Sequence, residues 1–234
     1  PEGGAHQSII TPSIGIELPE VDFYEPCFAQ ELEWIILNSM EKILARDKST
    51  YLRLSTRRID QSLFSMPDDF ESREILRKQI ISGAYLIIDR RDDIKYDVNL
   101  NVVNIFASGV MVPEAIKASN KLIEEGLFAN VINVTGAGPL YRSFQASTNA
   151  IFEGGNSNLF INNILSSDDT KAPIVSIVDG HSHSLAWLGG ALKTSIIPLG
   201  VSNFGQSGLP SELYKENNID SDSIIEACFT ALDN

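Results

Sequence analysis

Residues 21–55, which read VDFYEPCFAQELEWIILNSMEKILARDKSTYLRLS, decide the fold class of this chain. Residues 21–25 are largely apolar and Pro26 ends them, a pattern that predicts a short strand. Across residues 29–47 apolar side chains recur every three or four positions, which predicts a long amphipathic helix. Residues 50–55 alternate in polarity and predict a second strand. A strand, a helix and a strand in this order indicate a right-handed crossover between parallel strands.

Strands and helices continue to alternate through the rest of the chain. Residues 1–20 are punctuated by glycine and proline and are expected to be irregular. Residues 56–82 are charged, and we interpret them as a connector between two domains that ends in a helix around residues 72–79. Strands are then predicted at residues 84–89, 99–107, 129–134, 173–178 and 194–201, and helices at residues 113–125, 139–150, 184–192 and 222–232. This pattern is typical of an α/β fold in which helices cover a mixed, mostly parallel five-stranded sheet.

Composition argues against several classes of function. The 234 residues carry a formal net charge of −13, which argues against binding to a nucleic-acid backbone and against a basic patch for a membrane surface. No run of about 18 apolar residues could span a membrane and no secretory leader opens the chain, so we expect a cytoplasmic protein. Cys27 and Cys228 are expected to be buried free thiols. Because the chain begins at Pro1 without an initiator methionine, we expect further sequence upstream.

Three short motifs carry weaker signals. Residues 136–139 (GAGP) follow a predicted strand and open a helix, but they lack the third glycine of a dinucleotide-binding turn, so a tight turn is favoured. Residues 205–208 (GQSG) fail the spacing of a nucleophile elbow. His181 and His183 could offer two imidazoles to zinc, yet no third ligand is evident. A loop-positioning role, or a place at an active-site entrance or subunit interface, is favoured over metal binding, and no metal ligand is predicted.

Five segments together resemble the carboxy-terminal part of the transketolase superfamily. They are residues 3–8 (GGAHQS), 23–26 (FYEP), 51–57 (YLRLSTR), 60–61 (DQ) and 201–214 (VSNFGQSGLPSELY), the last followed by Ile219-Asp220. The likeness covers essentially the whole chain and is nearest to the homodimeric type of pyruvate dehydrogenase first component and its transketolase-like relatives. It implies that residues 1–66 are the end of a pyrimidine-binding domain, residues 67–82 a connector, and residues 83–234 a transketolase carboxy-terminal-like domain.

The resemblance also implies a cofactor. Enzymes of this superfamily use thiamine diphosphate, which serves as the electron sink when a C–C bond beside a carbonyl is cleaved. An amino-terminal domain holds the diphosphate and its magnesium, and a glutamate upstream of the GGAHQ loop activates the cofactor. Because neither region lies in these 234 residues, we expect this chain to bind no cofactor or metal by itself, and we predict no cofactor-binding residue.

By this likeness the chain is the carboxy-terminal part of a 2-oxo acid dehydrogenase, the decarboxylating and acyl-transferring first component of pyruvate dehydrogenase. There it would support dimerisation and active-site closure. One alternative is a transketolase that transfers two-carbon ketol units, and another is a separate subunit that pairs with a partner carrying the diphosphate domain. A third alternative is a non-catalytic α/β binding or regulatory module. The expected partners are a second copy of the chain and a lipoyl-bearing acyltransferase.

His6 is the one catalytic residue that the resemblance implies. In the family the matching histidine borders the substrate carbonyl beside the cofactor. An imidazole suits that position because it can donate a hydrogen bond to a developing oxyanion and carry a proton. Without the resemblance, a loop histidine of no consequence would be the favoured interpretation.

Overall fold

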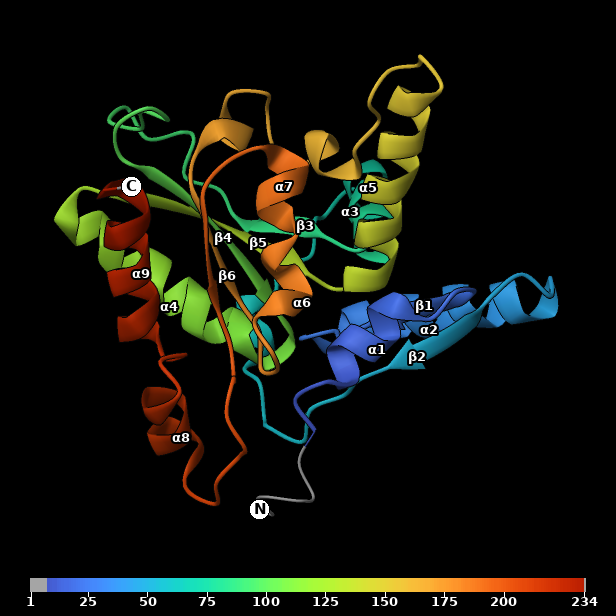
Figure 1. Ribbon diagram of the computed structural model, residues 1–234, viewed down its shortest axis with the longest axis horizontal. Coiled ribbons are helices and arrows are strands. Elements are labelled where there is room, and N and C mark those ends of the chain that lie inside the picture. Colours follow the sequence, from blue (N-terminus) through green and yellow to red (C-terminus); the bar gives the residue numbers. More distant parts are fainter. Residues whose placement is uncertain (1–7, 234) are drawn as a thin grey trace.

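The computed structural model describes residues 8–233, and these residues form two separate sheets. In Figure 1 a small unit with a two-stranded sheet lies beneath a larger unit built around a five-stranded sheet. The small sheet ends before the predicted connector and the large sheet begins after it. The domain boundaries at residues 66 and 82 themselves stay a prediction.

The small unit contains the predicted crossover. Strand β1 (Val21–Tyr24) pairs in parallel with β2 (Ser49–Leu52), and helix α2 (Ala29–Leu44) connects them. The side chain of Glu31 sets the start of α2, because its Oε2 accepts hydrogen bonds from the backbone nitrogens of Cys27 and Phe28 at 2.7 and 2.9 Å. A glutamate in the first turn that binds free amides in this way is a familiar helix-capping arrangement.

Helix α1 (Thr11–Glu17) corrects the prediction that residues 1–20 are irregular. Pro12 stands in its first turn, where the missing amide hydrogen costs nothing. A helix of seven residues is marginal by itself, so packing must hold it in place. Gly15 provides that packing, because a Cβ atom there would lie only 2.5 Å from the ring of Phe23 on β1.

The large unit contains the predicted five-stranded sheet, in the order β3-β5-β4-β6-β7. Strand β3 is antiparallel to β5 and the other neighbours are parallel, so the mixed, mostly parallel sheet is confirmed. The elements are η2 (Gln61–Leu63), α3 (Phe70–Ser82), β3 (Tyr85–Ile88), β4 (Val102–Ser108), η3 (Gly109–Met111), α4 (Val112–Leu122), η4 (Ile123–Glu125), β5 (Phe128–Val134), α5 (Ala137–Phe152), η5 (Phe160–Asn163), η6 (Asp169–Lys171), β6 (Ile174–Ile177), α6 (His183–Ala186), α7 (Leu188–Leu192), β7 (Ile196–Leu199), α8 (Pro210–Glu216) and α9 (Ser221–Asp233).

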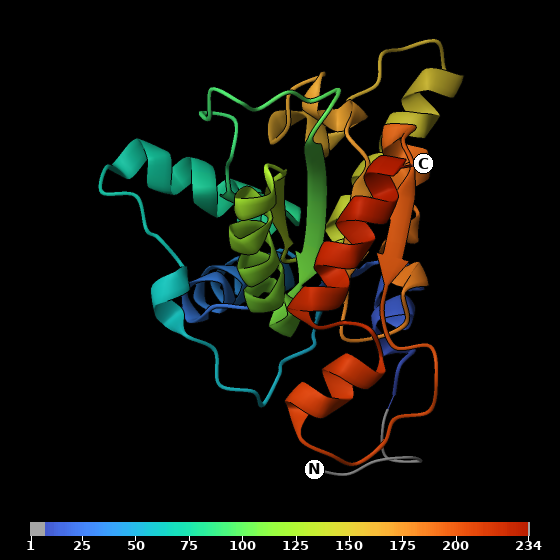
Figure 2. The same cartoon turned by 90° about the vertical axis from the view of Figure 1, so that its left-hand side faces the viewer.

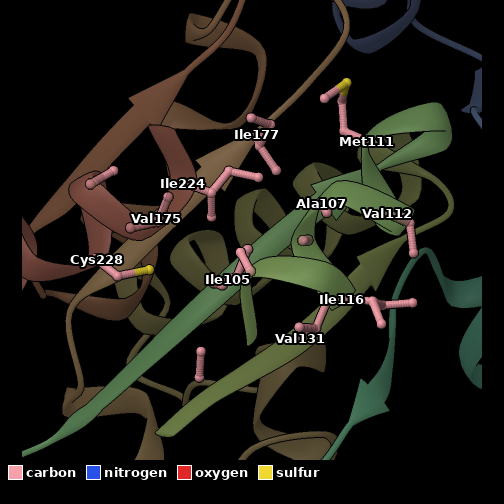
Figure 3. Close-up of a cluster of buried hydrophobic side chains, with 14 of the residues drawn as sticks. Ile105, Ala107, Met111, Val112, Ile116, Val131, Val175, Ile177, Ile224 and Cys228 are labelled. Carbon is pink, nitrogen blue, oxygen red and sulfur yellow. The ribbon is translucent and has the colours of Figure 1, made fainter. Parts of the chain in front are cut away.

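Helices cover both faces of the large sheet. Figure 2 shows α4 and α9 side by side against one face. Ile224 of α9 meets Ile105, Val131 and Val175 of the sheet in the apolar core drawn in Figure 3. Helices α5, α6 and α7 cover the opposite face. Every residue of β4 and β5 is buried, as expected for central strands covered on both sides.

The small unit packs against the start of α5. Gly136 and Gly138 allow this approach, because a Cβ atom at either position would lie 2.6 Å from the ring of Tyr24 or 3.0 Å from the backbone of Phe23. Strand β5 ends at Val134 and helix α5 begins at Ala137, so the predicted tight strand-to-helix turn is confirmed. The backbone nitrogen of Glu25 also donates to the carbonyl of Thr135 at 2.8 Å. The carboxyl ends of β1 and β5 therefore meet, and both sheets end at the same side of the molecule.

Candidate functional site

A cleft of about 650 Å³ lies on that side of the molecule. Its walls come from the chain that leaves β2, the loops after β6 and β7, helix α8 and the first described residues. The lining comprises Ser8, Ile9, Arg53, Ser55, Thr56, Arg57, Asp179, Gly180, Val201, residues 205–210, Leu213, Tyr214, Asn217 and Ile219. In an open α/β sheet, loops at the carboxyl ends of the strands are the usual place for a ligand site.

Arg53 comes directly after β2 and is fixed from two sides. Its guanidinium forms an ion pair with Glu25 and donates to the backbone oxygen of Asp179 at 2.6 Å. Glu25 is buried, and desolvation raises its pKa to about 7 although the charge of Arg53 opposes that shift. Gly109 leaves the space for the carboxylate, since it has a φ of 54° and a Cβ atom would lie 2.7 Å from Oε1 of Glu25.

Arg57 presents a second cation to the cleft. One of its nitrogens donates to Glu114 at 3.1 Å, and the guanidinium lies 5.0 Å from the centre of the Tyr214 ring. Its Nη1 atom is buried and has no hydrogen-bond partner among residues 8–233. A guanidinium with an unused donor beside a cleft is suited to binding an anionic group.

The loop of residues 179–183 connects the cleft to α1. The backbone nitrogen of His181 donates to the carbonyl of Ile9 at 2.9 Å. The Nδ1 atoms of His181 and His183 lie 2.6 Å apart, and Nε2 of His183 lies 2.7 Å from Oγ of Ser13. The loop-positioning interpretation of the two histidines is therefore supported by their contacts.

The described residues contain no candidate metal centre. Among residues 8–233, no three His, Cys, Asp or Glu side chains lie close enough together to hold a metal ion. Cys27 and Cys228 are both free thiols, but only Cys228 is buried as predicted, while Cys27 is half-buried. Burial raises the pKa of Cys228 to about 12. The cations of Arg53 and Arg57 are thus the chemically distinctive groups of the cleft.

His6, the predicted catalytic residue, lies outside the described residues. The first described positions, Ser8 and Ile9, line the cleft. Sequence reasoning did not single out Arg53, Arg57, Glu25 or Tyr214 as site residues. A usable signal was present, because Arg53 lies near the end of the strand predicted at residues 50–55 and Arg57 follows that strand, which belongs to a parallel unit. None of the described helices is long and apolar enough to cross a membrane.

Comparisons with known proteins agree with this fold. No protein-family model matches the chain. A transketolase from Leishmania mexicana superposes with a TM-score of 0.69 at 20% identity, over 99% of this chain and 28% of that one. A structure described as split gene transketolase, inactive beta4 tetramer, superposes with a TM-score of 0.59 at 16% identity, over 97% of this chain and 62% of that one. The fold is therefore that of the carboxy-terminal region of transketolases.

A match in sequence to one curated protein adds to this similarity in fold. The 6-deoxy-6-sulfo-D-fructose transketolase subunit of Clostridium sp. (strain MSTE9) is 32% identical over 135 residues, which are 56% of this chain and 34% of the relative. Fold and sequence together support a transketolase-like protein. They favour the transketolase alternative over the pyruvate dehydrogenase interpretation, which finds no match among these proteins. The chain spans only about a third of the length of the curated relative.

Proposed function

We propose that this chain is the carboxy-terminal part of a thiamine diphosphate-dependent transketolase-type enzyme that transfers two-carbon ketol units. The observation that carries the proposal is the cleft at the carboxyl ends of both sheets, with two arginines in its wall. The match to a transketolase subunit supports the reaction class. Transfer of a two-carbon unit, in place of oxidative decarboxylation, is the alternative that the sequence had left open.

The two arginines suggest the class of substrate. Arg53 is fixed by Glu25 and the Asp179 backbone, while Arg57 keeps one donor unused. We assign to Arg57 the binding of the anionic end of a ketose, such as a terminal phosphate or sulfonate, because a guanidinium forms charge-assisted hydrogen bonds with anionic oxygens. The curated relative acts, by its name, on a sulfonated sugar. Binding that end of an extended sugar would orient the carbonyl at its other end.

The cofactor is assigned to other parts of the enzyme. When bound, thiamine diphosphate supplies the electron sink for C–C bond cleavage. Among residues 8–233 no three His, Cys, Asp or Glu side chains gather into a candidate metal site, and the resemblance to the superfamily assigns the diphosphate and its magnesium to an amino-terminal domain. We place the diphosphate and its magnesium on an upstream segment or on a partner chain. This placement keeps the separate-subunit hypothesis open, and a second copy of this chain remains an expected partner.

His6 stays the proposed catalytic residue of this chain. This proposal rests on the resemblance of residues 3–8 (GGAHQS) to the family's loop. An imidazole that borders the substrate carbonyl can donate a hydrogen bond to a substrate oxygen or accept its proton. The expected effect of His6→Ala is a fall in turnover of about one hundredfold or more, with the complete enzyme still able to bind donor ketose.

The test is a two-carbon transfer assay on the complete enzyme, with a ketose phosphate or sulfonate as donor and an aldose as acceptor. Arg57→Gln should raise the KM for the anionic donor about tenfold or more, and should leave the KM for an uncharged ketose nearly unchanged. Arg58→Gln is the matched control, because Arg58 is exposed and does not line the cleft. Oxidation of pyruvate without any ketol transfer would overturn the proposal in favour of the 2-oxo acid dehydrogenase.

A further inference from the structure

A second cavity, of about 490 Å³, lies at the opposite ends of the small strands. It shares no lining residue with the cleft. Lys48, which directly precedes β2, and Arg142 of α5 both line this cavity. Nη1 of Arg142 donates to the carbonyl of Val21, at the start of β1, over 2.9 Å. The cleft, in contrast, begins with the residues that follow β2. The two cavities therefore open at opposite ends of the paired strands β1 and β2.

Three cations line this second cavity, in a chain with a net charge of −13. Lys42 and Arg142 are both held by Asp22, whose Oδ2 lies 2.6 Å from Nζ of Lys42 and whose Oδ1 forms the ion pair with Arg142. Asp22 is only 2% exposed, while the side chains of Lys42 and Arg142 are 28% and 25% exposed. One buried carboxylate thus fixes two cations in place but offsets only one of their charges.

Lys48 adds charge that is not neutralised. It makes no ion pair with any of the described residues within 4 Å. The remaining polar lining is neutral and includes Ser143, Asn158 and Asn163. Oγ of Ser143 accepts a hydrogen bond from the backbone of Phe160 at 2.9 Å, so its own proton is available for a ligand. Cations surrounded by neutral donors form a site for an anion that carries further hydroxyl groups.

We propose that this cavity binds a small phosphate monoester. Such a group carries between one and a half and two negative charges at pH 7, which matches the surplus charge of the lining. The volume suits a ligand of the size of a sugar phosphate. Because Lys42 and Lys48 belong to the small unit and Arg142 to the large one, the bound anion would hold the two units together (Figure 1). The site is thus a second, non-catalytic ligand site of the molecule.

The experiment titrates inorganic phosphate into the full chain at low ionic strength and follows binding by calorimetry. Lys48→Gln should weaken phosphate binding about fivefold or more, since it removes a cation that makes no ion pair with the described residues. Lys95→Gln is the matched control, because it removes the same charge from an exposed loop residue that lines neither cavity. Raising the salt concentration should weaken binding in the wild type through screening.

Arg57→Gln separates this cavity from the cleft. It should remove any phosphate binding that takes place at the cleft and leave the binding that depends on Lys48. The proposal is overturned if Lys48→Gln binds phosphate as tightly as Lys95→Gln, or if Arg57→Gln abolishes all binding. Neither result depends on turnover, so the transketolase assignment stands or falls separately.

Discussion

Glu31 is the most heavily bonded buried acid among the described residues. Its side chain is fully buried and accepts hydrogen bonds from four groups on three separate segments of the chain. Besides the two backbone amides at the start of α2, Oε1 accepts from the hydroxyl of Tyr85 at 2.6 Å and from Nδ2 of Asn133 at 2.7 Å. Tyr85 lies on β3 and Asn133 on β5, so this one carboxyl joins the small unit to the large sheet.

Replacing Glu31 should therefore lower the free energy of unfolding far more than replacing its neighbours. Glu31→Ala leaves the Tyr85 hydroxyl and the Asn133 amide buried without this acceptor, and we expect a loss of about 3 kcal/mol in the free energy of unfolding. Urea denaturation measures the change. Glu33→Ala is the control, because Glu33 is exposed on the same helix and should change stability by less than about 0.5 kcal/mol. Equal effects of the two substitutions would contradict the bridging role.

At the scale of single elements, α2 leaves an apolar strip uncovered. Ile36, Leu37, Met40, Ile43 and Leu44 are all exposed, and Leu44 is 84% exposed. The parallel pair β1–β2 is also the whole small sheet among the described residues, although parallel sheets are normally covered on both faces. A strip of this kind favours association, because contact with another surface would remove it from water.

We therefore predict that α2 lies in a homodimer interface. Light scattering at about 100 μM should give the mass of a dimer for the wild type, and Met40→Glu combined with Leu44→Glu should shift it towards the monomer, since burial of two new charges is unfavourable. Ile94→Glu controls for added charge, because Ile94 is 99% exposed in a loop of the large unit. A monomeric wild type at that concentration would contradict the prediction.

Most elements could be predicted from the sequence because their signals are local. The alternation of strand and helix in residues 21–55 is read directly from neighbouring residues, and so is Gly126, which ends η4 after α4. Helix α1 escaped prediction because packing on Phe23, and not its own pattern, holds it. The predicted helix at residues 184–192 is split into α6 and α7, and the strand predicted from residue 99 begins only at Val102.

The site was less predictable than the fold, because its contacts join distant positions. Arg53 meets a carbonyl 126 residues further along the chain, and Arg57 meets Glu114 and Tyr214. No local pattern specifies such pairs. Residue 6 was assigned by resemblance alone, and it lies outside the described residues.

For the whole molecule, the buried acids predict how stability changes with pH. Desolvation raises the pKa of both Glu25 and Glu31 to about 7, above the 4.5 of an exposed glutamate. Between these two values the folded chain binds more protons than the unfolded chain. The stabilisation from these groups is therefore complete below about pH 4.5 and is lost as the pH rises to about 7.

This prediction can be isolated with one substitution. The free energy of unfolding in urea should fall from pH 5.5 to pH 7.5 in the wild type, and Glu31→Gln should reduce that fall because glutamine does not titrate. Comparing the two proteins cancels the contributions of all other groups. The same pH dependence in both proteins would show that Glu31 is ionised throughout this range.

The loop of residues 179–183 has a consequence for how this protein can evolve. Its backbone and side chains contact four separate segments: Asp179 binds Arg53, Gly180 binds Val201, His181 binds Ile9 and His183 meets Ser13. An insertion in this loop would displace all four contacts at once, so we expect the loop to tolerate few changes in length. The turn around Phe204, which is 85% exposed, leads instead into residues 205–210, which line the cleft. New specificities should therefore arise by changes in length and composition of that turn, while the loop of residues 179–183 keeps its five residues.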